Sequence, residues 1–192
     1  MIASIRTIWV HPSSRGVALV FALLSVYVGS WFARIPEVQA ALGLTEAKLG
    51  LVLLGMPLGT LLVMPLSGWL VARWGAGRVT LITGLGQGVP FLFLSVVESG
   101  TGLVLVLLGA GVVNGVLNVA MNARANAVEE ARGTAIMSTC HGFFSLGGML
   151  GAGVGSVAAA LSLPLGGQFA GLIGLGALVM YLHREALLRG GD

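Results

Sequence analysis

The segment GTAIMSTCHGFFSLGGMLGAGVGSVAAALSLPLGGQFAGLIGLGALVMYLH, from Gly133 to His183, contains no Asp, Glu, Lys or Arg. A helix needs roughly 20 apolar residues to cross a hydrocarbon core about 30 Å thick, and this segment is long enough for two crossings. Pro164 and the glycines that follow it supply the turn chemistry for a break between Ser162 and Gln168. We therefore expect two consecutive membrane helices here.

The rest of the chain follows the same pattern, with short charged groups between apolar runs. Hydrophobic residues make up 56% of the chain and charged residues only 9%, against roughly 25% charged residues in a soluble domain. This composition disfavours a soluble protein and predicts an all-α, polytopic integral membrane bundle in contact with the lipid bilayer. Residues 1–192 are expected to form one domain of six transmembrane helices, at approximately 17–33, 49–72, 79–97, 102–123, 134–161 and 165–182.

The basic residues predict the orientation, because Lys and Arg in short loops favour the cytoplasm. Only Arg34 and Lys48 fall on the side opposite the N-terminus. The side of the N-terminus carries the remaining eight: Arg6, Arg15, Arg73, Arg78, Arg124, Arg132, Arg184 and Arg189. We expect a multi-pass protein of the inner (plasma) membrane with both termini in the cytoplasm.

Glycine is abundant, at 31 residues, and much of it lies inside the expected helices. Glycines spaced by four lie on one face of a membrane helix and let a neighbouring backbone approach closely. The spacing occurs at Gly55 and Gly59, Gly84 and Gly88, Gly111 and Gly115, and Gly147, Gly151 and Gly155. It predicts tight helix packing, and it is compatible with static helices or with helices that slide.

The segment from Gly68 to Arg78 resembles a signature of the major facilitator superfamily, Gly-x-Leu-x-Asp-Arg-aromatic-Gly followed by basic residues. Its matching positions are Gly68, Leu70, Arg73, Trp74 and Gly75, with Arg78 as a displaced basic residue. Ala72 replaces the acid, which in the family takes part in a cytoplasmic lock between the two halves of the transporter. The resemblance therefore leaves this lock in doubt.

Three other segments resemble a bacterial branch of the superfamily that is loosely related to fucose permease: residues 31–37, 118–123 and 141–148. The resemblance implies a bacterial secondary transporter. Family members have about twelve helices in two halves, and each half contains an inverted repeat of three plus three helices. This chain resembles the N-terminal half. Ala33-Arg34 and Ala123-Arg124 are a short echo of that repeat.

Asn114, Asn118 and Asn122 recur every four residues and are expected on one stripe of the fourth helix. In the family this helix borders the central cavity, so Asn114 and Asn118 are candidate solute-binding residues. Hydrogen bonding between helices, worth about 0.6 to 2 kcal/mol for each bond, explains the same stripe.

His141 is expected about two turns, or roughly 10 Å, into the fifth helix, at a depth similar to that of Asn118. An ionisable residue within a membrane is a functional candidate, and histidine changes charge near neutral pH. His141 is therefore a candidate for solute binding and for proton coupling. A neutral histidine hydrogen-bonded to Ser138, Ser145 or a neighbouring helix is the alternative.

Arg34 and Glu37 are expected at the outer end of the first helix, with Pro36 between them opposing helical continuation. They form either an outer gate pair or a solvated surface ion pair, which is worth under about 1 kcal/mol. Loop contacts are expected from the mixed charges between helices four and five: Arg124, Glu129, Glu130 and Arg132.

Several function classes lack the residues they need. No metal-ligand cluster, nucleotide-binding loop or nucleophile with an adjacent base is recognisable, so neither an enzyme nor a cofactor is expected. The basic residues are scattered, which disfavours nucleic-acid binding. Cys140 is the only cysteine, and we expect it to pack as a small apolar side chain.

Two functions remain. In the first hypothesis, the chain transports a small solute by alternating access, as a homodimer or with a separate C-terminal half. Alternatively, it is a truncated or split transporter with no activity alone that serves as a subunit or assembly partner. Its ending at Arg189 to Asp192, where the family's linker begins, favours the second function. The residues name neither the solute, nor its direction, nor a coupling ion.

Overall fold

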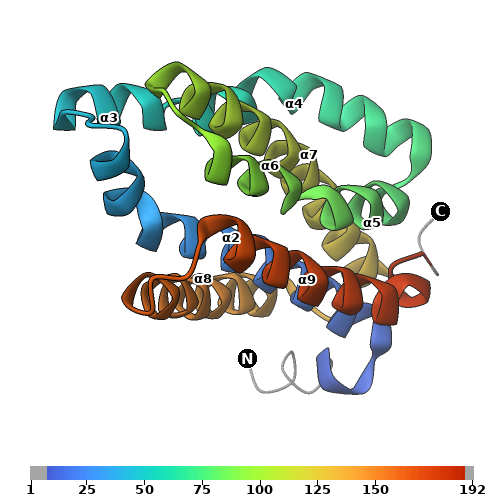
Figure 1. Ribbon diagram of the computed structural model, residues 1–192. Helices are drawn as coiled ribbons and strands as arrows, with labels where there is room; N and C mark the ends of the chain where they lie inside the picture. The colour runs from blue at the N-terminus through green and yellow to red at the C-terminus, as the bar shows by residue number, and fades with distance from the viewer. Residues whose placement is uncertain (1–7, 189–192) are drawn as a thin grey trace.

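The structure is a computed structural model that describes residues 8–188, and in this part of the chain six helical spans are long and apolar enough to cross a membrane. The predicted all-α membrane bundle of six crossings is confirmed (Figure 1). Arg6 and Arg189, which contributed to the predicted orientation, lie outside the described residues. The spans are α2 (Pro12–Ala41), α3 with α4 (Glu46–Leu53 and Gly55–Trp74), α5 with α6 and the 3-10 helix η1 (Ala76–Gly86, Val89–Leu92 and Phe93–Val96), α7 (Gly100–Arg132), α8 (Met137–Ala160) and α9 (Leu165–Leu188).

Several helices are longer than the apolar runs that predicted them. α2 continues through Pro36 to Ala41, and α7 continues to Arg132. Charged residues end the hydrocarbon-compatible stretch, but they do not interrupt the backbone hydrogen bonds of a helix. The expectations that Pro36 ends the first helix and that the charges after Ala123 lie in a loop are therefore wrong.

Two spans are interrupted where a proline removes a helical hydrogen bond. Proline has no backbone N–H, so Pro57 leaves the carbonyl of Leu53 without its helical donor, and Pro90 does the same to Gly86. α3 ends at Leu53 and α5 ends at Gly86. The second and third spans therefore each contain a break.

The close packing of α4 against α7 depends on glycine. A Cβ atom at Gly59 would overlap the carbonyl oxygen of Leu108, and one at Gly111 would overlap that of Met56. Each helix therefore presents glycine to the backbone of the other. The predicted close packing of these glycines is confirmed.

α2 and α8 meet in the same way. Cβ atoms at Gly147, Gly151 and Gly155 would clash with the backbone of α2, and a Cβ at Gly29 would clash with the backbone of α8. Closely approaching backbones gain dispersion contacts that compensate for the weak hydrophobic drive between helices in lipid. The bundle is therefore organised around two glycine-packed helix pairs.

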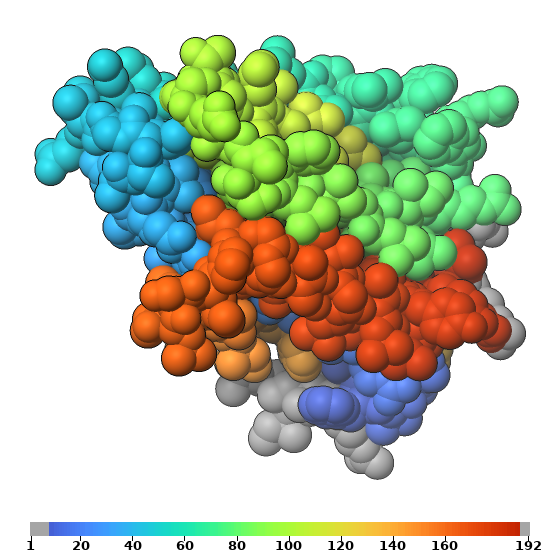
Figure 2. All heavy atoms as spheres, viewed as in Figure 1, coloured from blue at the N-terminus to red at the C-terminus, as the bar shows by residue number. Residues whose placement is uncertain are grey.

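The packing follows an inverted repeat. An inverted repeat relates the first span to the fourth, the second to the fifth and the third to the sixth. Under this relation, the contact of α2 with α8 corresponds to the contact of α7 with α4. In the same way, the contact of α2 with α9 becomes that of α7 with α5. All four contacts are present, and the contact of α5 with α9, also seen in Figure 2, maps onto itself. This arrangement matches the 3+3 repeat of a transporter half.

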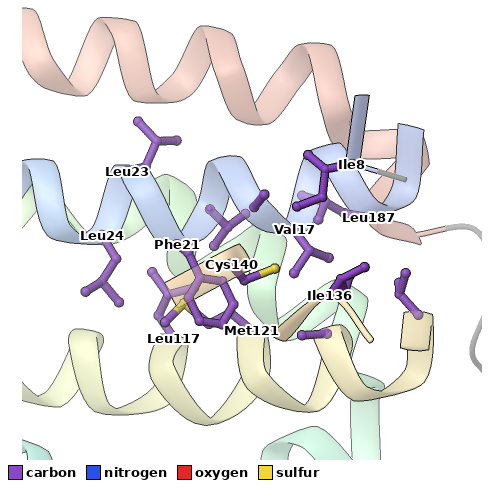
Figure 3. Packing of buried hydrophobic residues seen from close by; sticks show 14 of the residues in the cluster. Ile8, Val17, Phe21, Leu23, Leu24, Leu117, Met121, Ile136, Cys140 and Leu187 are labelled. Carbon is purple, nitrogen blue, oxygen red and sulfur yellow. The ribbon is translucent and has the colours of Figure 1, made fainter. Parts of the chain in front are cut away.

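A buried apolar cluster lies where α2, α7 and α8 meet (Figure 3). Phe21 of α2 packs there with Leu117 and Met121 of α7 and with Cys140 of α8. The side chain of Cys140 is fully buried, which confirms its predicted role in apolar packing.

Gly111 and Gly109 provide a matched test of this packing. Gly111→Ala places a methyl group against the Met56 backbone, whereas a Cβ at Gly109 meets no atom within 4 Å. We expect Gly111→Ala to destabilise the protein by about 1 to 3 kcal/mol through overpacking. Gly109→Ala should be neutral or stabilising, because alanine favours a helix over glycine by about 1 kcal/mol. Thermal unfolding in detergent measures both, and equal midpoints would contradict the packing described.

Candidate functional site

A stripe of exposed polar side chains runs along α8. Ser138, His141, Ser145 and Ser156 are all exposed, and their spacing places them on one face of the helix together with Met149 and Ala152. We call Ser138, His141, Ser145 and Ser156 the polar stripe of α8. Such a stripe is unusual in a membrane span, where exposed positions are normally apolar.

A different face of α8 carries exposed apolar residues, among them Leu150, Gly153 and Val157. These three residues line a shallow groove of about 670 Å³ between α8 and α9, together with Gly167 and Gly171. This surface is suited to lipid. α8 therefore presents a polar and an apolar exposed face, which adjoin at Met149.

The asparagines of α7 do not share one surface. Asn114 is buried in the row that continues with Leu117 and Met121, which faces α2, whereas Asn118 is exposed. Positions four apart drift by about 40° around a helix with 3.6 residues per turn, and this drift moves Asn118 out of the buried row. The expectation that all three asparagines share one stripe is therefore wrong for Asn114, whereas the side chains of Asn118 and Asn122 lie together.

The hydrogen bonds of these asparagines are local. Asn122 Nδ2 donates to the Asn118 carbonyl at 2.8 Å, within α7. Asn114 Nδ2 is buried and has no partner among the described residues. In the part of the chain that the structure describes, none of the three asparagines forms a hydrogen bond to another helix, so the interhelical alternative is not supported.

His141 lies one turn into α8, about 6 Å from its start at 1.5 Å per residue. The predicted depth of two turns is wrong, because α8 begins at Met137 and not at Thr134. The ring packs edge-on against Phe21, with 5.3 Å between ring centroids. Ser145 Oγ donates to the His141 backbone carbonyl, and within residues 8–188 the imidazole has no hydrogen bond. The alternative of an imidazole hydrogen-bonded to Ser138, Ser145 or a neighbouring helix is therefore not supported.

The late start of α8 has a local cause on α7. Glu129 Oε1 accepts the backbone N–H groups of Ile136 at 2.5 Å and Met137 at 2.7 Å. These two N–H groups have no hydrogen-bond acceptor within α8. The carboxylate also interacts favourably with the positive end of the helix dipole. Glu129 therefore fixes the beginning of the helix that carries the polar stripe.

Arg34 is buried, with 1% of its side chain exposed. Its Nε lies 2.7 Å from Glu37 Oε2, Nη1 donates to Gln168 Oε1 at 3.0 Å, and Nη2 donates to the Leu163 carbonyl at 2.7 Å. Gln168 in turn donates to Ser30 Oγ. The alternative of a solvated ion pair is wrong for Arg34, because its guanidinium ties α2 to the beginning of α9.

Arg124 holds the other end of α9. It is buried, and its Nη2 donates to the Ala186 carbonyl at 3.2 Å. Arg34 lies seven residues before the end of α2 and Arg124 lies eight residues before the end of α7, so they occupy equivalent positions of the repeat and bind opposite ends of α9. The repeated Ala-Arg pair was the signal for this arrangement, but the sequence did not reveal that either arginine is buried.

The signature segment forms the tight corner between α4 and α5. Gly75 is the single residue between these helices, and its φ of +83° is readily adopted only by glycine. Arg73, Trp74 and Arg78 are exposed around the corner. Gly68 and Leu70 lie within α4. No group of three or more potential metal ligands occurs among the described residues.

Comparison with known proteins agrees with this architecture. The sequence model of the Major Facilitator Superfamily matches residues 12–191. The chain is 38% identical to an uncharacterised MFS-type transporter of Yersinia pestis, over 90% of this chain and 45% of that protein. It is 32% identical to an uncharacterised transporter of Sinorhizobium fredii, over 79% of this chain and 40% of that protein. It is 30% identical to the membrane protein MosC of Rhizobium meliloti, over 70% of this chain and 33% of that protein. The chain thus spans less than half the length of these relatives.

Arg34 and Lys48 test the importance of the buried arginine. Both are basic and lie at the same end of the bundle, but Lys48 is exposed. Arg34→Gln leaves the Leu163 carbonyl and Gln168 without their charged donor, and loss of a buried ionic partner typically costs about 3 to 5 kcal/mol. We expect a large drop in the thermal unfolding midpoint for Arg34→Gln and little change for Lys48→Gln. Similar midpoints for the two variants would show that the Arg34 network does not hold α9.

Proposed function

The chain belongs to the major facilitator superfamily, and on this premise we propose that it forms one side of a pathway through which a small solute crosses the membrane by alternating access. The polar stripe of α8 is the observation that carries the proposal. Polar side chains in a membrane span face protein or water, because exposure to hydrocarbon is costly. The stripe therefore requires a covering partner or an aqueous pathway.

Asn118 and His141 are the proposed solute contacts. Both side chains are exposed, and the His141 ring also contacts Phe21 of α2. His141 remains the candidate for proton coupling, because its imidazole is exposed and has no hydrogen bond within residues 8–188. The buried Asn114 can contact a solute only if α7 moves relative to α2.

A six-span unit needs a second unit to close its pathway. The two halves of the family are parallel repeats around an axis normal to the membrane. Either a second copy of this chain or a separate C-terminal half would supply the second unit in that arrangement. In the alternative, the chain is a truncated or split transporter that has no activity alone and serves as a subunit or assembly partner of a separate C-terminal half. In the orientation that the basic residues predict, Arg34 and Glu37 lie at the outer end of the bundle and both termini lie in the cytoplasm.

The two exposed faces of α8 allow a direct test in membrane vesicles. Ser145→Cys lies in the polar stripe, and Leu150→Cys lies on the lipid-facing side of the same helix. The native Cys140 is fully buried and provides a low background. We expect a membrane-impermeant maleimide to label Ser145→Cys at least several-fold faster than Leu150→Cys, because thiol alkylation requires a hydrated thiolate.

The unmodified protein serves as the control for labelling at Cys140. Equal labelling of the two variants, or faster labelling of Leu150→Cys, would contradict an aqueous pathway along the polar stripe.

A further inference from the structure

A pocket of about 470 Å³ lies at the end of the bundle where α2 begins and α7 and α9 end. None of the four residues of the polar stripe of α8 lines this pocket. Its lining includes Ser13 from α2, Arg132 from α7, and Leu182, Arg184 and Glu185 from α9. Three helices thus bring two guanidinium groups to one hollow.

The two arginines of the pocket have only neutral partners within residues 8–188. Arg132 donates to His11 Nδ1 at 3.0 Å and to Ser13 Oγ at 3.3 Å. Arg184 donates to the Tyr181 carbonyl at 2.8 Å and lies 4.0 Å above the Tyr181 ring. A guanidinium has five N–H donors, so both arginines retain donors for an anion.

The charge of the lining indicates which anion fits. Arg132 and Arg184 contribute two positive charges, and Glu185 contributes one negative charge, which leaves a net charge of +1. A phosphodiester carries a single negative charge and accepts hydrogen bonds from guanidinium groups in the geometry that arginine favours. The pocket therefore suits a phosphodiester better than a multiply charged phosphate.

The surroundings favour a lipid over a soluble phosphodiester. Tyr181 and Leu182 are 59% and 64% exposed, and they lie on α9, a membrane span, beside the charged lining. A headgroup in the pocket would place its acyl chains next to this apolar surface. Basic pockets between helix ends are known to recognise anionic headgroups. We propose that this pocket binds the headgroup of an anionic phospholipid such as phosphatidylglycerol, in the leaflet at this end of the bundle.

Lipid retention measured by native mass spectrometry tests the site. The intact, delipidated protein is titrated with dioleoylphosphatidylglycerol and, separately, with dioleoylphosphatidylcholine. An arginine near an anionic membrane surface contributes a factor of roughly five in affinity. We therefore expect Arg132→Gln with Arg184→Gln to weaken phosphatidylglycerol binding roughly 25-fold and to leave phosphatidylcholine binding unchanged.

Two further variants keep the test decisive if the double variant folds poorly. Arg78→Gln removes an exposed arginine at the same end of the bundle but outside the pocket, and it should retain the wild-type affinity. Glu185→Gln removes the opposing charge, and it should strengthen phosphatidylglycerol binding. Equal losses in Arg78→Gln and in the pocket variants would overturn the proposal, and so would weaker binding by Glu185→Gln.

A soluble competitor distinguishes the two sources of the phosphodiester. Glycerophosphoglycerol has the same headgroup chemistry without acyl chains. We expect it to displace the lipid only at concentrations orders of magnitude above that of the lipid. Displacement at matched concentration would assign the pocket to a soluble phosphodiester and overturn the lipid assignment.

Discussion

Backbone contact at glycine is the constraint on which the rest of this bundle depends. Lipid tails are as apolar as the side chains they surround, so helices in a membrane associate mainly through close van der Waals contact. The glycines of α4 and α7 face one another's backbones, and the same is true of α2 and α8. These two contacts fix α2 and α7, on which the other helices pack. The inverted repeat of the family is therefore visible as a repeated mode of contact, although it is barely visible in the sequence.

The two glycine-packed pairs also determine where polar chemistry can lie. α8 uses its glycine face against α2 and its apolar face toward the groove beside α9, which leaves the polar stripe on the remaining surface. α9 is held at both ends by buried arginines, Arg34 from α2 and Arg124 from α7. Glycine contact thus fixes the centre of the bundle, and charge-assisted hydrogen bonds position its periphery.

The crossings could be predicted from the sequence because hydropathy and length determine which segments enter lipid. The helix ends could not, because backbone hydrogen bonding continues through charged residues such as those that end α7. The beginning of α8 depends on Glu129, which is remote from the apolar pattern that defined the crossing. The network of Arg34 could not be predicted either, because its partner Gln168 is distant in the sequence. The separation of Asn114 from Asn118 was accessible in principle, since a spacing of four drifts around the helix, but which of the two becomes buried depends on the position of α2.

We propose that a second six-span unit in the membrane covers the exposed polar face of this six-span unit. The mass of the purified protein in lipid nanodiscs tests this claim most directly, because a second copy is then the only unit available. The account predicts a particle with two chains of 19.6 kDa each. A stable particle with one chain would contradict it, since the polar stripe of α8 would then face lipid.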